Sequence, residues 1–164
     1  MDRAAPRFRD ALELLAAHAV EFVVVGGVAA VLEGAPISTF DLDIVHARTP
    51  ANVERLLAAL GAMNATYRDP GGLQIAPTAD GLLGPGHHLL MTTCGPLDVL
   101  GQIGRSSDWT ALMPLSAPRN LGTAEVYVLG LKGLIAAKEE SARPKDLAML
   151  PILRRALRES PPRG

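Results

Sequence analysis

Apolar and polar positions along the chain follow two spacings, one typical of helices and one of strands. Phe8, Leu12 and Leu15 recur every three or four residues, which predicts an opening amphipathic helix. The run 22–25 is short, apolar and β-branched, and it stops at two glycines. It therefore predicts a strand and a glycine turn, followed by a short helix that ends at Gly34.

The same two spacings predict four more strands and three more helices. The strands cover 38–45, 88–93, 97–100 and 125–129, and the helices cover 50–61, 132–140 and 144–159. Mixed elements of this kind predict an α/β (α+β) fold, with a mixed β-sheet flanked by helices.

Two stretches, 69–86 and 101–120, lack either spacing and are expected to be irregular. The first holds five glycines and three prolines and predicts a long loop, which is either functional or poorly ordered. His87 and His88 end this loop. They are candidates for contact with a ligand, and the simpler interpretation is ordinary loop polarity.

Length and composition favour one soluble domain. The 164 residues suit a single unit, which we place at 1–160 with a frayed tail at 161–164. The single cysteine excludes an internal disulfide, and we expect a reducing, cytoplasmic compartment. No apolar run reaches the roughly 20 residues of a membrane span. The net charge of -1 gives no broad nucleic-acid footprint.

The first candidate for chemistry is the pair Asp41 and Asp43 in the strand predicted over 38–45. Side chains two apart on a strand share a face, with Cα atoms roughly 6.5 Å apart, so the two carboxylates repel each other. A hard divalent ion such as Mg²⁺ would relieve this repulsion. The alternative is a half-exposed strand with two solvated acids.

The glycine turn supplies a second candidate. Gly26 and Gly27 open the short helix, where free backbone N–H groups and the helix dipole favour a phosphate. The alternative is a tight turn packed against the sheet. Asp98 is the third candidate, because it lies between two apolar residues of the strand 97–100. A third carboxylate on a neighbouring strand would complete a site for two metal ions.

These motifs resemble a known family. The matching segments are Gly26-Gly27-x-Ala29, Thr39-x-Asp41-x-Asp43 and Leu97-Asp98-Val99, with 41–50, 84–88, 134–138 and 143–147 matching a narrower group. They are similar to the nucleotidyltransferase superfamily, which has a polymerase-β-like fold. More narrowly, they resemble small bacterial proteins related to the AbiEii-type toxins of toxin–antitoxin systems. The resemblance covers roughly residues 20 to 150.

The resemblance implies roles for the matched residues. Asp41 and Asp43 would hold the metal ions, Mg²⁺ or Mn²⁺, and Asp98 would complete the metal site and help to activate the acceptor. Gly26 and Gly27 would hold the triphosphate.

Further nucleotide contacts are implied for Thr39 of the same motif and for Lys138, with Lys145 and Asp146 nearby. A lysine that extends along an amphipathic helix is the alternative for Lys138. For Asp146 the alternative is an acid in the first turn of a helix.

The implied reaction moves a nucleoside monophosphate from a nucleoside triphosphate to a hydroxyl of an RNA, a protein or a small molecule. The resemblance also implies an antitoxin partner and no association with a membrane. One departure matters: many relatives carry Gly-Ser at the turn, whereas here Val28 follows Gly26-Gly27. This departure favours the alternative of a nucleotide-binding or antitoxin-binding module without efficient turnover.

Two other enzyme classes fit less well. A dinucleotide-binding unit needs G-x-G-x-x-G, and Val28 stands where its second glycine should be. A sugar-nucleotide glycosyltransferase shares Asp-x-Asp but needs a larger sheet and an acceptor domain.

Overall fold

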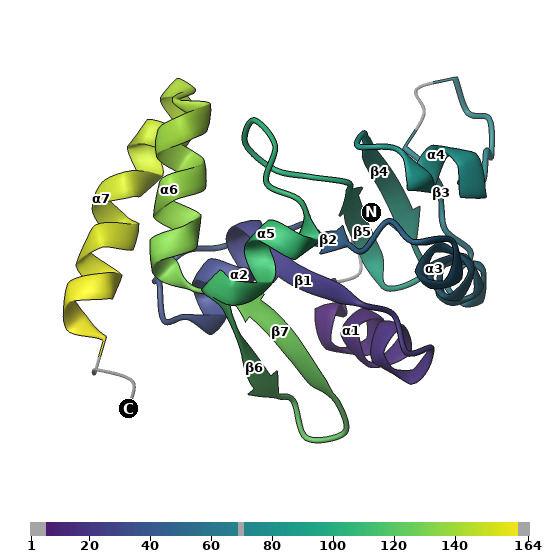
Figure 1. Cartoon of the computed structure of the whole chain (residues 1–164), viewed down its shortest axis with the longest axis horizontal. Coiled ribbons are helices and arrows are strands. Elements are labelled where there is room, and N and C mark those ends of the chain that lie inside the picture. Colours follow the sequence, from purple (N-terminus) through teal and green to yellow (C-terminus); the bar gives the residue numbers. More distant parts are fainter. Residues whose placement is uncertain (1–5, 69–70, 161–164) are drawn as a thin grey trace, which may run out of the picture.

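The computed structural model describes residues 6–68 and 71–160, and a single mixed sheet forms its centre (Figure 1). The strands are β1 Phe22–Val25, β2 Leu42–His46, β3 Thr66–Tyr67, β4 His87–Thr92, β5 Gly95–Leu100, β6 Ser116–Asn120 and β7 Glu125–Leu129. The helices are α1 Phe8–Ala17, α2 Gly26–Leu32, α3 Pro50–Ala62, α4 Ala79–Leu83, α5 Trp109–Leu112, α6 Leu131–Ser141 and α7 Pro144–Glu159, with a 3-10 turn, η1, at Met113–Leu115.

Within the described residues the sheet has seven strands, in the order β3-β4-β5-β2-β1-β7-β6. β2 runs parallel to β5 and antiparallel to β1, while β4 and β5 form a hairpin. β1 and β7 are parallel, and β6 closes the far edge against β7. The strands that carry the predicted acids, β2 and β5, are therefore neighbours near the middle of the sheet.

One hydrophobic core fixes these strands. Ile44, Val99 and Val24 have no exposed surface, and Leu15 of α1 and Leu56 of α3 pack into the same core. Helices α1 and α3 touch each other near one end of the molecule, while α6 and α7 lie side by side at the opposite end (Figure 1). This arrangement leaves α6 and α7 next to the ends of the central strands.

Local signals explain where several helices begin. Thr49 caps α3 by accepting a hydrogen bond from the N–H of Asn52, and Pro50 occupies the first turn. Pro144 likewise opens α7, which continues through Pro151 as one helix. Gly34 follows the end of α2 with a φ of +96°, the left-handed conformation that glycine adopts freely.

The structure corrects several predicted boundaries. The strand expected over 38–45 begins only at Leu42, so Asp41 precedes it. Gly61 lies inside α3 and does not end it, because the helix extends to Ala62.

The two stretches expected to be irregular contain regular elements. The stretch 69–86 contains α4, which Thr78 caps, although its residues 69–70 lie outside the described part. The stretch 101–120 contains α5 and the edge strand β6. Trp109, the first residue of α5, is half-buried against the core. The two-residue strand β3 was not predicted.

Across 6–68 and 71–160, every helix is too short or too polar to cross a membrane. The single domain at 1–160 stays a prediction, and the expected tail, 161–164, lies outside the described residues.

Candidate functional site

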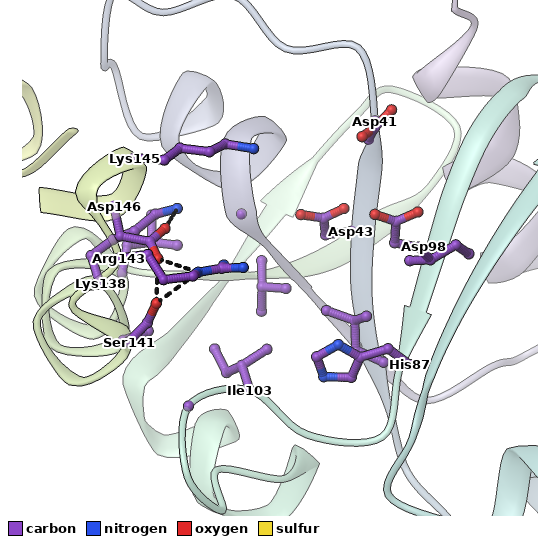
Figure 2. A pocket seen from close by; sticks show the side chains of 17 residues that line it. Asp41, Asp43, His87, Asp98, Ile103, Lys138, Ser141, Arg143, Lys145 and Asp146 are labelled. Atoms are coloured by element: carbon purple, nitrogen blue, oxygen red, sulfur yellow. Dashed lines mark hydrogen bonds and ion pairs between the residues drawn. The ribbon is translucent and has the colours of Figure 1, made fainter. Parts of the chain in front are cut away.

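Asp43 and Asp98 lie directly opposite each other on parallel strands. The register of β2 and β5 pairs Asp43 with Asp98, and the apolar neighbours Leu42 and Leu97 pair on the other face of the sheet. Side chains of paired residues share a face, so the two carboxylates lie side by side, as Figure 2 shows. The sequence placed both acids on strands, and the strand order makes them neighbours.

Asp43 is a carboxyl group in an unfavourable place for a negative charge. Burial, the charge of Asp98 and a hydrogen bond with Asp98 raise the pKa of Asp43 from 3.8 to about 7. Asp41 adds to the rise, and Lys138 opposes it. The Oδ1 atom of Asp43 is buried and has no hydrogen-bond partner among the described residues. The free protein at neutral pH therefore holds a carboxyl oxygen that lacks a donor or a cation.

Asp98 has a partner that the sequence did not indicate. The Nη2 atom of Arg68 lies 2.6 Å from Oδ1 of Asp98, and its Nη1 atom donates to the carbonyl oxygen of Leu90 at 3.0 Å. Both side chains of the ion pair are largely buried, with 27% and 15% of their surface exposed. Arg68 directly follows β3, the strand that the hydrophobic pattern failed to predict.

Asp41 lines the same cavity as Asp43 and Asp98 but lies apart from them. It is exposed, it precedes β2, and in Figure 2 its carboxylate sits away from the other two. The hydroxyl of Thr39 donates to the backbone oxygen of Asp41 at 3.1 Å, which fixes the chain just before β2. The structure thus brings two of the three predicted acids into contact and leaves the third at the rim.

The glycine turn is held tightly against these acids. Gly26 has a φ of +66°, and a Cβ there would clash with Oδ2 of Asp43. A Cβ on Gly27 would lie 2.6 Å from Oγ1 of Thr39. Glycine is therefore required at both positions by close approach, and at Gly26 also by backbone conformation. Gly26 lines the cavity, whereas Gly27 and Thr39 do not.

The opposite wall of the cavity is cationic and comes from α6 and α7. Lys138, Arg143 and Lys145 all line it (Figure 2). Lys138 donates to Oδ1 of Asp146 at 2.9 Å, and Arg143 donates to Oδ2 of Asp146 at 2.9 Å. Lys145 is exposed and has no ion-pair partner among the described residues.

Asp146 organises this wall and is 1% exposed. Burial alone would raise the pKa of Asp146. The hydrogen bonds from Ser141, Lys138 and Arg143 outweigh burial and hold the pKa of that carboxyl well below its usual range. Asp146 therefore stays ionised and fixes two of the cations. It does not offer a free oxygen to a ligand.

The two walls enclose a cavity of about 310 Å³. The acids of β2 and β5 lie on one side, and the amines and guanidinium of α6 and α7 lie on the other (Figure 2). His87 and Ile103 also line the cavity, and the Nε2 atom of His87 donates a hydrogen bond to the backbone oxygen of Gln102 at 3.0 Å. His88 instead bonds to the hydroxyl of Tyr67 at 2.6 Å and does not line the cavity.

Sequence reasoning missed three polar residues of the site: Arg68, Ser141 and Arg143. Arg143 could have been found, because it belongs to the late block 143–147 that carries the resemblance. No sequence signal marks Arg68 as a partner of Asp98, since the two are 30 residues apart and meet only through strand order.

The chemistry and geometry of the acids decide whether they can hold a metal ion. Across 6–68 and 71–160, no group of three His, Cys, Asp or Glu side chains is assembled that could hold a metal ion. The unpaired Oδ1 of Asp43 beside Asp98 does fit a hard cation, because Mg²⁺ binds through one or two carboxylates together with substrate phosphates. The two-ion site expected from the sequence stays a prediction.

Comparisons with known proteins support the fold. No family model and no curated protein matches the chain. Among solved structures, a Thermotoga maritima protein described as a "putative nucleotidyltransferase" is similar, with a TM-score of 0.52 and 14% sequence identity. The match covers 93% of this chain and 91% of that chain. The chain has the nucleotidyltransferase fold.

That result confirms the predicted fold class: a mixed sheet flanked by helices. The narrower likeness to AbiEii-type toxins stays a prediction.

Proposed function

We propose that this protein is a metal-dependent nucleotidyltransferase that moves a nucleoside monophosphate from a nucleoside triphosphate to a hydroxyl group. The observation that carries the proposal is a cavity with an unpaired, buried carboxyl oxygen on one wall and clustered cations on the other. A triphosphate with its divalent ion matches both walls, because the ion suits the acids and the phosphates suit the cations. The fold of the Thermotoga maritima protein supports the same class.

In this proposal Asp43 and Asp98 hold Mg²⁺ or Mn²⁺, with Asp41 available at the rim. When bound, the ion supplies positive charge for the phosphates and polarises the phosphoryl group that is attacked. Asp98 also orients the acceptor hydroxyl and takes up its proton. Lys138, Lys145 and Arg143 bind the phosphates and stabilise the negative charge that develops on the leaving pyrophosphate.

The glycine turn lets the backbone come close to the nucleotide, but it supplies no side-chain hydrogen-bond donor. Gly26 lets the backbone reach the cavity wall beside Asp43. Gly27 and Thr39 act as supports for this turn, since Thr39 leaves no room for a Cβ on Gly27 and neither residue lines the cavity. Asp146 acts through Lys138 and Arg143, which it holds in place, and does not contact the nucleotide.

The acceptor and the biological role rest on the motif resemblance. We propose an RNA, a protein or a small molecule as acceptor, and a toxin role with an antitoxin partner, in the cytoplasm. Two exposed arginines of α7 give the RNA acceptor little support, because Arg154 and Arg155 already pair with Glu139 and Glu159.

A second candidate, a nucleotide-binding or antitoxin-binding module without efficient turnover, is favoured by one structural observation in addition to the glycine turn that lacks a serine. Arg68 already neutralises Asp98, the residue assigned to the acceptor. Such a module would bind nucleotide and transfer nothing.

Transfer assays with Lys138→Ala separate the two functions. For the enzyme, loss of one donor that stabilises the transition state should lower turnover on the order of a hundredfold, while nucleotide binding weakens far less. Lys132→Ala, an exposed lysine of α6 outside the cavity, is the control and should transfer at the normal rate. If the unchanged protein binds nucleoside triphosphates but moves no label to RNA or protein, the module is correct.

A further inference from the structure

Arg68 stands in direct contact with the acid pair. Its guanidinium lies 2.6 Å from Oδ1 of Asp98 and donates a second hydrogen bond to the backbone oxygen of Leu90. Both side chains of the ion pair are largely buried, so water screens this contact less than it screens a surface ion pair. An arginine keeps its charge at every physiological pH.

The position of Arg68 is set by the sheet edge. Tyr67 pairs with Leu90, and the N–H of Arg68 donates to the backbone oxygen of Leu89 at 3.0 Å. In the strand order β3-β4-β5-β2, Arg68 approaches Asp98 from the β4 side, while Asp43 lies on the β2 side. Asp98 is therefore held between a fixed cation and its partner acid.

On the wall formed by Asp41, Asp43 and Asp98, the charges suit one divalent ion better than two. Asp41, Asp43 and Asp98 together carry three formal negative charges when ionised, and Arg68 neutralises one of them. Two negative charges remain, which equals the charge of one Mg²⁺. A second ion at Asp98 would have to sit near a guanidinium that cannot release its proton, at an oxygen already occupied by a hydrogen bond.

We propose that Arg68 takes the place of a second divalent ion, so that the site holds a single ion and uses the guanidinium as the permanent countercharge of Asp98. This inference rests on the proposed function. A consequence is that Asp98 alone activates the acceptor hydroxyl, because a guanidinium cannot bind a hydroxyl as a metal ion does.

Mn²⁺ titration followed by electron paramagnetic resonance tests this directly. The unchanged protein should bind one Mn²⁺ with a signal free of spin coupling. Arg68→Gln should bind two, with a spin-coupled signal, because ions that share such a site lie roughly 3.5–4 Å apart. Arg68→Lys keeps the positive charge and should still bind one.

Arg55→Gln is a matched control. Arg55 also bonds to one backbone oxygen, that of Ala19, and to one carboxylate, that of Glu21, and it lies outside the cavity. This variant should bind one uncoupled ion. Asp43→Asn should lose the ion, which would show that the bound Mn²⁺ is held by Asp43 and Asp98.

Different results of this titration test the proposed function and the role of Arg68. No bound Mn²⁺ in the unchanged protein, or an ion that survives Asp43→Asn, would overturn the proposed function itself. Two coupled ions in the unchanged protein, or a single ion in folded Arg68→Gln, would overturn only the role of Arg68. If Arg68→Gln does not fold, the count in the unchanged protein and in Arg68→Lys still decides: one ion supports the inference and two contradict it.

Discussion

At the scale of single residues, the protonation of Asp43 should control both stability and metal binding. Its pKa is raised to about 7 in the folded protein, so the folded state binds a proton that the unfolded state releases near pH 4. The free energy of unfolding should therefore fall as pH rises from about 4 to about 7. At roughly 1.4 kcal/mol per pKa unit, the loss has an upper limit of about 4 kcal/mol.

Denaturant unfolding at a series of pH values measures this loss in the metal-free protein. Asp43→Asn should make the free energy of unfolding depend less on pH. Asp80 is an exposed acid of α4, so Asp80→Asn should leave the pH dependence unchanged. Equal slopes for the unchanged protein and Asp43→Asn would place the titration elsewhere. Because a bound ion must displace the proton, Mg²⁺ should bind more tightly as pH rises through 7.

Gly26 provides a second test at this scale. Gly26→Ala combines a left-handed backbone, φ +66°, with a clash against the carboxylate of Asp43. We expect a loss of about 1–3 kcal/mol in stability and weaker Mn²⁺ binding. Gly34→Ala is the matched control, since Gly34 has a φ of +96° but nothing within 4 Å of its Cβ position. It should lose less stability and bind Mn²⁺ normally. Equal effects of the two variants would mean that the contact with Asp43 does not matter.

At the scale of elements, the junction of α6 and α7 depends on one buried acid. Asp146 accepts charge-assisted hydrogen bonds from Lys138 on α6 and Arg143 before α7. Its pKa is depressed in the folded state, so its contribution is present above about pH 4 and is lost as pH falls further. Asp146→Asn should cost about 1–3 kcal/mol at pH 7 and remove that acid dependence.

Thermal and denaturant unfolding at pH 7 and pH 3 measure this cost. Glu159→Gln is the control. It breaks the ion pair between Arg155 and Glu159, whose side chains are 74% and 66% exposed respectively, and should change stability by less than about 0.5 kcal/mol. A cost for Asp146→Asn as small as that would show that the network does not hold the two helices together.

The elements also show how far the sequence predicts this fold. Strong periodicity located α1, β1, α2, α3, β4, β5, β7, α6 and α7 to within a few residues, because each buries apolar side chains. The short elements α4, α5, β3 and β6 were missed. Glycines and prolines dominate the sequence around α4, and β6 is an edge strand with Pro118 in it, so neither shows a clear spacing.

At the scale of the whole molecule, the site depends on strand order, which local pattern does not encode. Asp43 and Asp98 could be predicted as acids on one face, since each interrupts an apolar strand. Their contact requires β2 and β5 to be parallel neighbours. Arg68 could not be predicted, because it reaches Asp98 only after β3 and β4 have paired at the sheet edge.

At the same scale, the activity proposed for this cavity is the transfer of a nucleoside monophosphate. The most direct measurement follows two labels, one on the α-phosphate and one on the γ-phosphate of each nucleoside triphosphate, with Mg²⁺ or Mn²⁺ and with total RNA and protein as acceptors. We predict that the α-label moves to an acceptor and the γ-label leaves with pyrophosphate, and that Asp43→Asn and Asp98→Ala abolish transfer while remaining folded. Transfer of the γ-label, or α-label transfer that survives both substitutions, would contradict the account.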